Sequence, residues 1–309
     1  MASGGNAPIV VGIDGSPSAT QAAVWAAGEA VARGSSVHLV YAYEWAADEG
    51  PGRVALRANA RYRDVFLLYA QDSMREAAAR VREAVPGVEL TEELAVGRPE
   101  QVLTEQSGRA SMLVVGTRGL GGVSGLLLGS VAVSLVSRAK CPVVVVRGDG
   151  RPAGAVGADA AVEVSADAPV VVGVDGSPMS EAALAYAYEA ASVHGAPLVA
   201  VHAWHLSPED SRLVPYIDLD VVAAEEERLV AEQTAGWAEK YPDVTLRRVV
   251  VMGRPGHVLR EQSAGARLLV VGARGRGGVA GLLLGSTSQA LIHRADCPVA
   301  VVRPRSDGE

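Results

Sequence analysis

Two glycine-rich segments in this sequence have a composition and spacing suited to binding a phosphate group. Each follows the pattern G-x2-G-x9-G-S, formed by Gly116, Gly119, Gly129 and Ser130 in the first segment and by Gly272, Gly275, Gly285 and Ser286 in the second. Glycine lets the backbone approach a ligand closely, because it has no Cβ atom. A helix that begins at each Gly-Ser pair would offer unpaired N–H groups to an anion. The pattern therefore predicts two phosphate cradles, with a tight turn closed by a serine N-cap as the alternative.

An acidic residue follows the first apolar run of each half. "GIDGS" places Asp14 just after Gly12, and "GVDGS" places Asp175 just after Gly173. In open parallel sheets, ligands bind beyond the carboxyl ends of the strands, which is where these residues would lie. We therefore expect Asp14 and Asp175 to contact the ligand, whereas an Asx turn or a helix N-cap is the competing interpretation.

Three common phosphate-binding motifs do not fit these loops. A P-loop needs Lys before its Ser or Thr, but Gly129 and Gly285 stand there. The dinucleotide motif GxGxxG should follow the first strand, where this sequence has "GIDGSP". A phosphorylated receiver domain would have Lys at the end of its last strand, where Arg147 and Arg303 occur instead. The predicted cradle is therefore of another type.

Arginines within the loops are candidate charge partners for a chain of phosphates. They are Arg118, Arg274 and Arg276, and the competing interpretation is solvated loop charge. Arg276 stands where the first half has Leu120, so the two sites can differ in affinity. We also include the glycines Gly122 and Gly278, inside the loops, among the binding residues.

The loops belong to a two-fold internal repeat. "VVGIDGSPSA" from Val10 recurs as "VVGVDGSPMS" from Val171, and "CPVVVVR" from Cys141 recurs as "CPVAVVR" from Cys297. The segment 114–130 recurs as 270–286 with 14 of 17 positions identical. A period near 156 residues is a domain duplication, since solenoid units are much shorter.

Strands and helices alternate in each half. The predicted strands are 9–13, 36–43, 88–96, 111–115 and one from Cys141, then 170–174, 197–204, 244–251, 267–271 and one from Cys297. The predicted helices are 18–33, 61–84, 100–107 and one from near Gly129, then 180–194, 220–240, 256–263 and one from near Gly285. Nearly continuous apolar strands indicate a parallel sheet covered on both faces. We predict an α/β protein of two tandem doubly wound (Rossmann-like) domains, each a five-stranded parallel sheet with helices on both faces.

The predicted boundaries follow from composition. Residues 148–168 are rich in Gly, Ala and Asp without a stable periodicity, which is typical of a linker. They would separate a first nucleotide-binding domain, 1–147, from a second one, 169–309.

Composition excludes several classes of protein. The 309 residues carry a net charge of −7 with one Phe and four Trp, which weighs against a nucleic-acid binder. Two cysteines cannot form a disulfide scaffold, so we expect a reducing cytoplasm. The absence of a signal peptide and of apolar runs of about 18 residues predicts no membrane association.

Other reactive residues give no pattern of their own. The six His have no convincing metal-ligand spacing, and no Ser-His-Asp or Cys-His arrangement is suggested, so no catalytic or metal-ligating residue is assigned. Cys141 and Cys297 occupy equivalent positions and are expected to be packed thiols, with a redox role left open.

The chain resembles the universal stress protein family, in tandem form and of its ATP-binding branch. The resemblance rests on the "VGxDGS" start, the G-x2-G-x9-G-S loop and the closing "CPVxVVR" strand, each present twice. It implies ATP, with Mg²⁺, in each half. By motif position, Asp14 and Asp175 would approach the ribose or the metal ion, and the backbone at Ala42 and Ala203 would contact adenine.

The resemblance also assigns roles to the loops and to the whole protein. The loop glycines and serines would hold ribose and phosphates, and Val131 and Thr287 would extend the contacts at the helix start. A homodimer, an unidentified regulatory protein partner and a role in stress response or growth arrest are implied as well. A binding protein is expected rather than an enzyme, because no general base or phosphate-directed Lys is placed. The alternatives are a slow Mg²⁺-dependent ATPase or phosphotransferase and a nucleotide-free scaffold.

Overall fold

The chain divides into two compact units, Met1–Val162 and Glu163–Glu309. A computed structural model describes residues 7–44, 60–117, 119, 129–147, 165, 167–205, 218–276 and 284–304. The expected linker, 148–168, lies almost entirely outside the described residues, so its boundaries stay a prediction.

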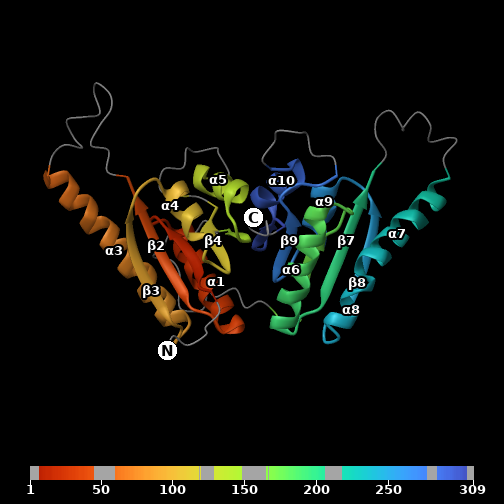
Figure 1. Cartoon of the computed structure of the whole chain (residues 1–309), viewed down its shortest axis with the longest axis horizontal. Helices are drawn as coiled ribbons and strands as arrows, with labels where there is room; N and C mark the ends of the chain where they lie inside the picture. Colours follow the sequence, from red (N-terminus) through yellow and green to blue (C-terminus); the bar gives the residue numbers. More distant parts are fainter. Residues whose placement is uncertain are drawn as a thin grey trace, which may run out of the picture. The chain divides into compact units, whose positions relative to one another are not determined.

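The first unit is a parallel five-stranded sheet covered by helices (Figure 1). Its strands are β1 (Ile9–Ile13), β2 (Val37–Tyr43), β3 (Leu90–Val96), β4 (Met112–Gly116) and β5 (Val143–Val146). Its helices are α1 (Pro17–Arg33), α3 (Ala60–Ala84), α4 (Pro99–Gln106) and α5 (Ser130–Arg138). The strand order is β3-β2-β1-β4-β5, and each strand pair is parallel.

The second unit repeats this arrangement. Its strands are β6 (Val170–Gly173), β7 (Leu198–Trp204), β8 (Leu246–Met252), β9 (Leu268–Gly272) and β10 (Val299–Val302). Its helices are α6 (Pro178–His194), α7 (Leu219–Ala235), α8 (Trp237–Lys240), α9 (Pro255–Gln262) and α10 (Ser286–Arg294). The parallel order β8-β7-β6-β9-β10 confirms the predicted doubly wound class.

The strand order reverses at one point in each unit's part of the sheet. From β1 the chain moves outward to β2 and β3 and then returns to β4 on the other side of β1. The connections therefore diverge between the ends of β1 and β4, and in the second unit between β6 and β9, which is where open α/β sheets bind ligands. Because Asp14 and Asp175 follow β1 and β6 while the glycine loops follow β4 and β9, the topology brings the two motifs together.

The central strands hold the core of each unit. Apolar side chains of β1, β4, β6 and β9 are almost completely buried, as expected for strands covered on both faces. Helices α1 and α6 pack Ala-rich faces on them, starting at the N-caps Ser16 and Ser177 and ending at Gly34 and Gly195. These two glycines have φ values of 60° and 57°, a left-handed conformation that glycine adopts without strain.

One predicted helix is interrupted. The sequence predicts a continuous helix over 220–240, but the structure has α7 and the short α8 with a break at Gly236. Glycine is about 1 kcal/mol less favourable than Ala in a helix. Trp237 and Tyr241 stack on Tyr188 of α6, at centroid distances of 5.5 and 5.7 Å. This stacking packs α8 on α6 after the break at Gly236.

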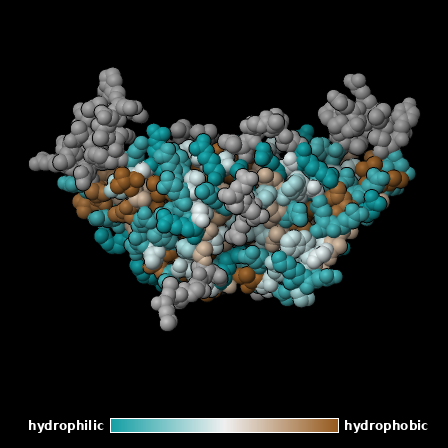
Figure 2. Space-filling view, in the orientation of Figure 1, coloured by the Kyte–Doolittle hydropathy of each residue, from teal (hydrophilic) through white to brown (hydrophobic). Residues whose placement is uncertain are grey.

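Helix α3 presents an apolar stripe to solvent. Val65, Leu68 and Tyr69 are 64%, 58% and 42% exposed, and hydrophobic atoms gather over this helix in Figure 2. In α7 the matching positions are Val221, Ala224 and Glu225, so the two units differ on this surface. Among the described helices, none is both long enough and apolar enough to cross a membrane.

Both cysteines are buried thiols, which leads to a prediction about their reactivity. Burial raises the pKa of the Cys297 thiol to about 11, although hydrogen bonds including one with Ser263 oppose this. The reactive thiolate is therefore scarce near neutral pH. We expect neither Cys141 nor Cys297 to react with a thiol-specific reagent in the native protein at about pH 8, and both to react after unfolding. Rapid labelling of either thiol in the native protein would contradict this and restore a redox role.

Candidate functional site

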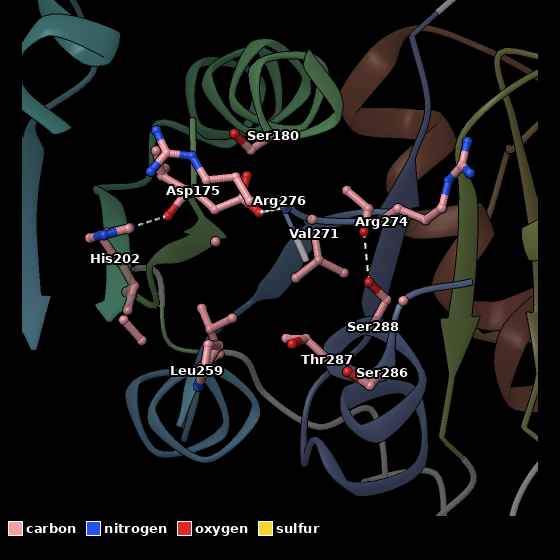
Figure 3. A pocket seen from close by; sticks show the side chains of 18 of the residues that line it. Asp175, Ser180, His202, Leu259, Val271, Arg274, Arg276, Ser286, Thr287 and Ser288 are labelled. Atoms are coloured by element: carbon pink, nitrogen blue, oxygen red, sulfur yellow. Dashed lines mark hydrogen bonds between the residues drawn. The ribbon is translucent and has the colours of Figure 1, made fainter. Parts of the chain in front are cut away.

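The second unit has a pocket of about 620 Å³ at the carboxyl ends of β6, β7 and β9 (Figure 3). Pockets for small molecules typically measure about 300–1,000 Å³. Each predicted site residue of this half that the structure describes lines it: Gly173, Asp175, Ala203, Gly272, Arg274, Gly275, Gly285, Ser286 and Thr287. Gly278 lies outside the described residues.

Asp175 links the end of β6 to the glycine loop. Its Oδ1 accepts hydrogen bonds from the Ser177 backbone N–H at 3.0 Å and from the Ser177 hydroxyl at 2.6 Å. Its Oδ2 accepts from the backbone N–H of Arg276 at 2.9 Å. The Asx turn is therefore formed, and the second oxygen fixes the beginning of the loop beside the pocket.

These hydrogen bonds lower the pKa of Asp175. Burial alone would raise the pKa, but the bonds from Ser177, Arg276 and Ser180 outweigh it. A carboxyl group with a lowered pKa in the folded state adds stability above its unfolded pKa of about 3.9, and that stability is lost as the pH falls through the folded value.

We therefore expect Asp175→Asn to reduce the acid sensitivity of the second unit. Its free energy of unfolding in urea should fall less steeply than that of the parent as the pH is lowered below about 4, because the substituted amide cannot ionise. Asn cannot accept from Arg276 through its amide nitrogen, so the variant should also be less stable at neutral pH. Parallel pH profiles for parent and variant would contradict this role.

Gly275, which directly precedes Arg276 in the loop, leaves no room for a side chain. A Cβ atom on Gly275 would lie closer than 3.0 Å to Oδ2 of Asp175, and one on Gly119 would make the same contact with Asp14. The backbone of each loop therefore lies directly against the carboxylate. This close approach explains why glycine is needed at both positions.

Among the described residues, no side chain caps the helix that starts at the pocket. Gly285 is the N-cap of α10, with Ser286 and Thr287 as its first two residues, and no side chain in the described part of the chain bonds to its first N–H groups. Gly129 caps α5 in the same way. The serine N-cap considered as an alternative is therefore wrong for both helices. By contrast, the hydroxyls of Ser16 and Ser177 accept from N–H groups of α1 and α6.

Two arginines of the loop line different sides of the pocket (Figure 3). Arg274 and Arg276 line the pocket, and Figure 3 shows the Arg276 side chain beside Asp175. Burial lowers the pKa of Arg303, and the nearby Arg274 guanidinium lowers it further.

Two predicted glycines of each half have a packing explanation. A Cβ atom on Gly12 would lie 2.9 Å from Cδ1 of Leu103, and one on Gly173 would lie 3.1 Å from Cδ1 of Leu259. A Cβ atom on Gly116 would lie 2.7 Å from the backbone carbonyl carbon of Ser18, where α1 crosses the end of β4. Gly272 approaches Met179 of α6 in the same manner.

The first unit has the same framework where the structure describes it. Oδ1 of Asp14 accepts from the Ser16 backbone N–H at 2.9 Å, and the Gly129 N–H donates to the Thr117 carbonyl at 2.9 Å. Ser130 and Val131 begin α5, and Ala42 lies next to last in β2. Arg118 and Gly122 lie outside the described residues.

Sequence reasoning did not assign His202 and Glu226 to the site, although both line the pocket. His202 directly precedes Ala203 on β7, so its place beside the predicted adenine contact could have singled it out. Glu226 on α7 gave no signal, because its approach depends on how the helix packs on the sheet. Within the described residues, no three His, Cys, Asp or Glu side chains gather as a metal site would require.

Comparison with known proteins places this architecture in one family. The universal stress protein family matches residues 5–147 and again 168–303. A universal stress protein of Mycobacterium tuberculosis is 40% identical over 302 residues, covering 96% of each chain, and one of Mycolicibacterium smegmatis is 35% identical over 299 residues, covering 96% of this chain and 97% of that one. The crystal structure of a universal stress protein from Archaeoglobus fulgidus shares the fold, with a TM-score of 0.68 at 20% identity over 97% of each chain. The chain thus belongs to the universal stress protein family and contains the family's domain twice.

Proposed function

We propose that this protein binds ATP in each half and that nucleotide occupancy regulates its interaction with a protein partner during stress or growth arrest. The observation that carries the proposal is the second-half pocket, where the glycine-capped start of α10, two arginines and a close-lying glycine loop meet. Such a site favours an anionic ligand that contacts backbone. Preservation of the loop spacing in both halves supports a second site in the first unit.

The pocket offers a place for each part of ATP. The start of α10, with Ser286 and Thr287, and the two arginines would receive the phosphates. Asp175 and the backbone at Gly275 would contact the ribose. The backbone at Ala203 would contact adenine, as the family resemblance implies.

Mg²⁺ would be held mainly by the phosphates and by water. This ion commonly keeps several waters and few protein ligands. Both oxygens of Asp175 already accept hydrogen bonds, so we assign this carboxylate to the ribose rather than to the metal. The ion would offset the charge of the bound triphosphate.

Binding is favoured over catalysis because the described lining of the pocket contains no lysine that could face a transferred phosphate. Equilibrium dialysis of nucleotide-free protein against labelled ATP and Mg²⁺ tests the proposal. We expect about two ATP per chain and recovery of the nucleotide as ATP. Recovery as ADP would favour the slow ATPase, and no binding would favour the nucleotide-free scaffold.

The proposal also covers the location, the assembly and the partner of the protein. Two buried thiols support a reducing, cytoplasmic location. A homodimer and an unidentified regulatory partner are proposed from family resemblance. Comparing the sedimentation coefficient with and without ATP would measure whether occupancy changes assembly.

A further inference from the structure

The wall of the pocket formed by β7 and α7 differs chemically from its counterpart in the first unit. The strand segments "VYAY" and "VHAW" place His202 where the first half has Tyr41. On the helices, Glu226 and Ala70 lie at the same distance along the chain before the next strand, so Glu226 takes the place of the fully buried Ala70. A tyrosine beside an alanine is thus replaced by a histidine beside a glutamate.

The His202 ring is buried between two hydrogen-bond acceptors. It is only 4% exposed, and its Nδ1 lies 2.6 Å from the backbone carbonyl oxygen of Val174. Its Nε2 lies 2.9 Å from Oε2 of Glu226. A carbonyl oxygen only accepts, and a neutral imidazole has a single N–H to donate. Both hydrogen bonds therefore form together only when the pair holds one extra proton, on the ring or on the carboxyl group.

Of the two carboxylates that line the pocket in the described residues, Glu226 is the one that bonds the His202 ring. Asp175, at the end of β6, directs its oxygens to Ser177 and to the Arg276 N–H. His205, Arg274 and Arg276 are the other titratable side chains among the described lining.

Among the described residues of the neighbouring elements, Arg248 is a charged group on the side of the sheet that α7 covers. Arg248 of β8 lies two residues before Val250, the register partner of His202, and its Nε donates to Thr234 of α7 at 2.7 Å. From α9, Pro255 and Leu259 line the pocket.

The shared proton connects α7 to the end of β7 at the pocket wall. Without it, one of the two hydrogen bonds is lost, and a lone pair of the buried imidazole faces either the Val174 carbonyl or the partly exposed Glu226 carboxylate, which is unfavourable. The first unit lacks this requirement. There Tyr41 makes an edge contact with Phe66 at 6.5 Å, and burial, Tyr69 and Asp14 raise the pKa of Tyr41 to about 12.

We propose that His202 and Glu226 are positioning residues of the second ligand site, so that nucleotide binding in the second half requires their shared proton while binding in the first half does not. This inference rests on the proposed function. It makes the two halves of the protein respond differently to pH.

Two single-site proteins test the proposal directly. Gly119→Asp leaves only the second site and Gly275→Asp leaves only the first. Calorimetric titration with ATP and Mg²⁺ from about pH 6 to about pH 9 gives the affinity of each half. The affinity of the second half, divided by that of the first, should fall as the pH rises, by up to about tenfold per pH unit for one linked proton. The division removes the ionisation of ATP itself.

Glu226→Gln separates the proton from the packing. A glutamine amide can donate to Nε2 of a neutral ring while Nδ1–H still donates to the Val174 carbonyl, so both hydrogen bonds survive without the extra proton. We expect the double variant Gly119→Asp/Glu226→Gln to bind ATP in its second half. Its affinity, divided by that of the first half measured in Gly275→Asp, should no longer change with pH. Transplanting the first half's pair, as His202→Tyr with Glu226→Ala, should also flatten the ratio.

Each outcome decides a different question. If the ratio of the two affinities does not change with pH when Glu226 is present, the proton link is overturned and the proposed function stands. The same holds if Glu226→Gln leaves the pH dependence of that ratio unchanged. Binding by neither half at any pH overturns the proposed function and this inference together. If a pair variant does not fold, comparison of the two single-site proteins still decides the matter.

Discussion

Gly275→Asp should abolish ATP binding in the second half, and Gly119→Asp should do so in the first, each with at least about a hundredfold loss of affinity, or about 2.8 kcal/mol. A Cβ atom at either position would lie closer than 3.0 Å to a carboxylate oxygen, of Asp175 or Asp14 respectively. The new carboxylate would also bring a second negative charge into a site proposed to receive phosphates. Stoichiometry measured by calorimetry should fall from about two to about one for each single variant.

Matched controls are available elsewhere in the chain. A Cβ atom added to Gly28 or Gly236 would meet no atom of the described residues within 4 Å, so Gly28→Asp and Gly236→Asp make the same change of charge without a collision. Both controls should keep two sites. Retention of two sites by Gly275→Asp, with the controls unchanged, would show that the loop is only a turn.

Gly116→Ala should destabilise the first unit by about 1–3 kcal/mol, because a methyl group cannot fit where α1 crosses β4. The added Cβ would lie 2.7 Å from the carbonyl carbon and 2.8 Å from the carbonyl oxygen of Ser18. These are backbone atoms, so relief requires movement of the whole helix. Urea unfolding measures the change in the free energy of unfolding.

Alanine substitutions at Gly272 and Gly28 should rank below Gly116→Ala in their cost to stability. At Gly272, the closest backbone atoms of Met179 would lie 3.0 Å from a new Cβ, so Gly272→Ala should cost less. Gly28→Ala, in an open helical position, should instead stabilise by up to about 1 kcal/mol. If Gly116→Ala proves no more destabilising than Gly28→Ala, the close helix crossing is not real.

The repeated motifs carried enough information to predict where the pocket of the second unit lies. Asp175 and Gly275 are distant in sequence, but each follows a strand beside the point where the strand order reverses. Recognising a parallel sheet was therefore sufficient to bring them together. The valine-rich strands and the Ser-Pro helix starts predicted most elements for the same local reasons.

Features that depend on how elements pack could not be predicted. Glu226 reaches His202 only through the placement of α7 on β7, and no spacing in the sequence encodes that contact. The same holds for Gly116, whose neighbour Ser18 is set by a helix crossing. The cap of α10 was uncertain because both Gly285 and Ser286 suit an N-cap, and the backbone places the glycine there.

The most direct measurement is the nucleotide content of the protein as purified, without added nucleotide. The protein is denatured, and the released adenine nucleotides are separated by chromatography and counted per chain. About two ATP per chain, falling by about one in each of Gly119→Asp and Gly275→Asp, is the predicted result. No released nucleotide, together with no binding when ATP is added back, would contradict nucleotide binding and leave both glycine loops as structural turns.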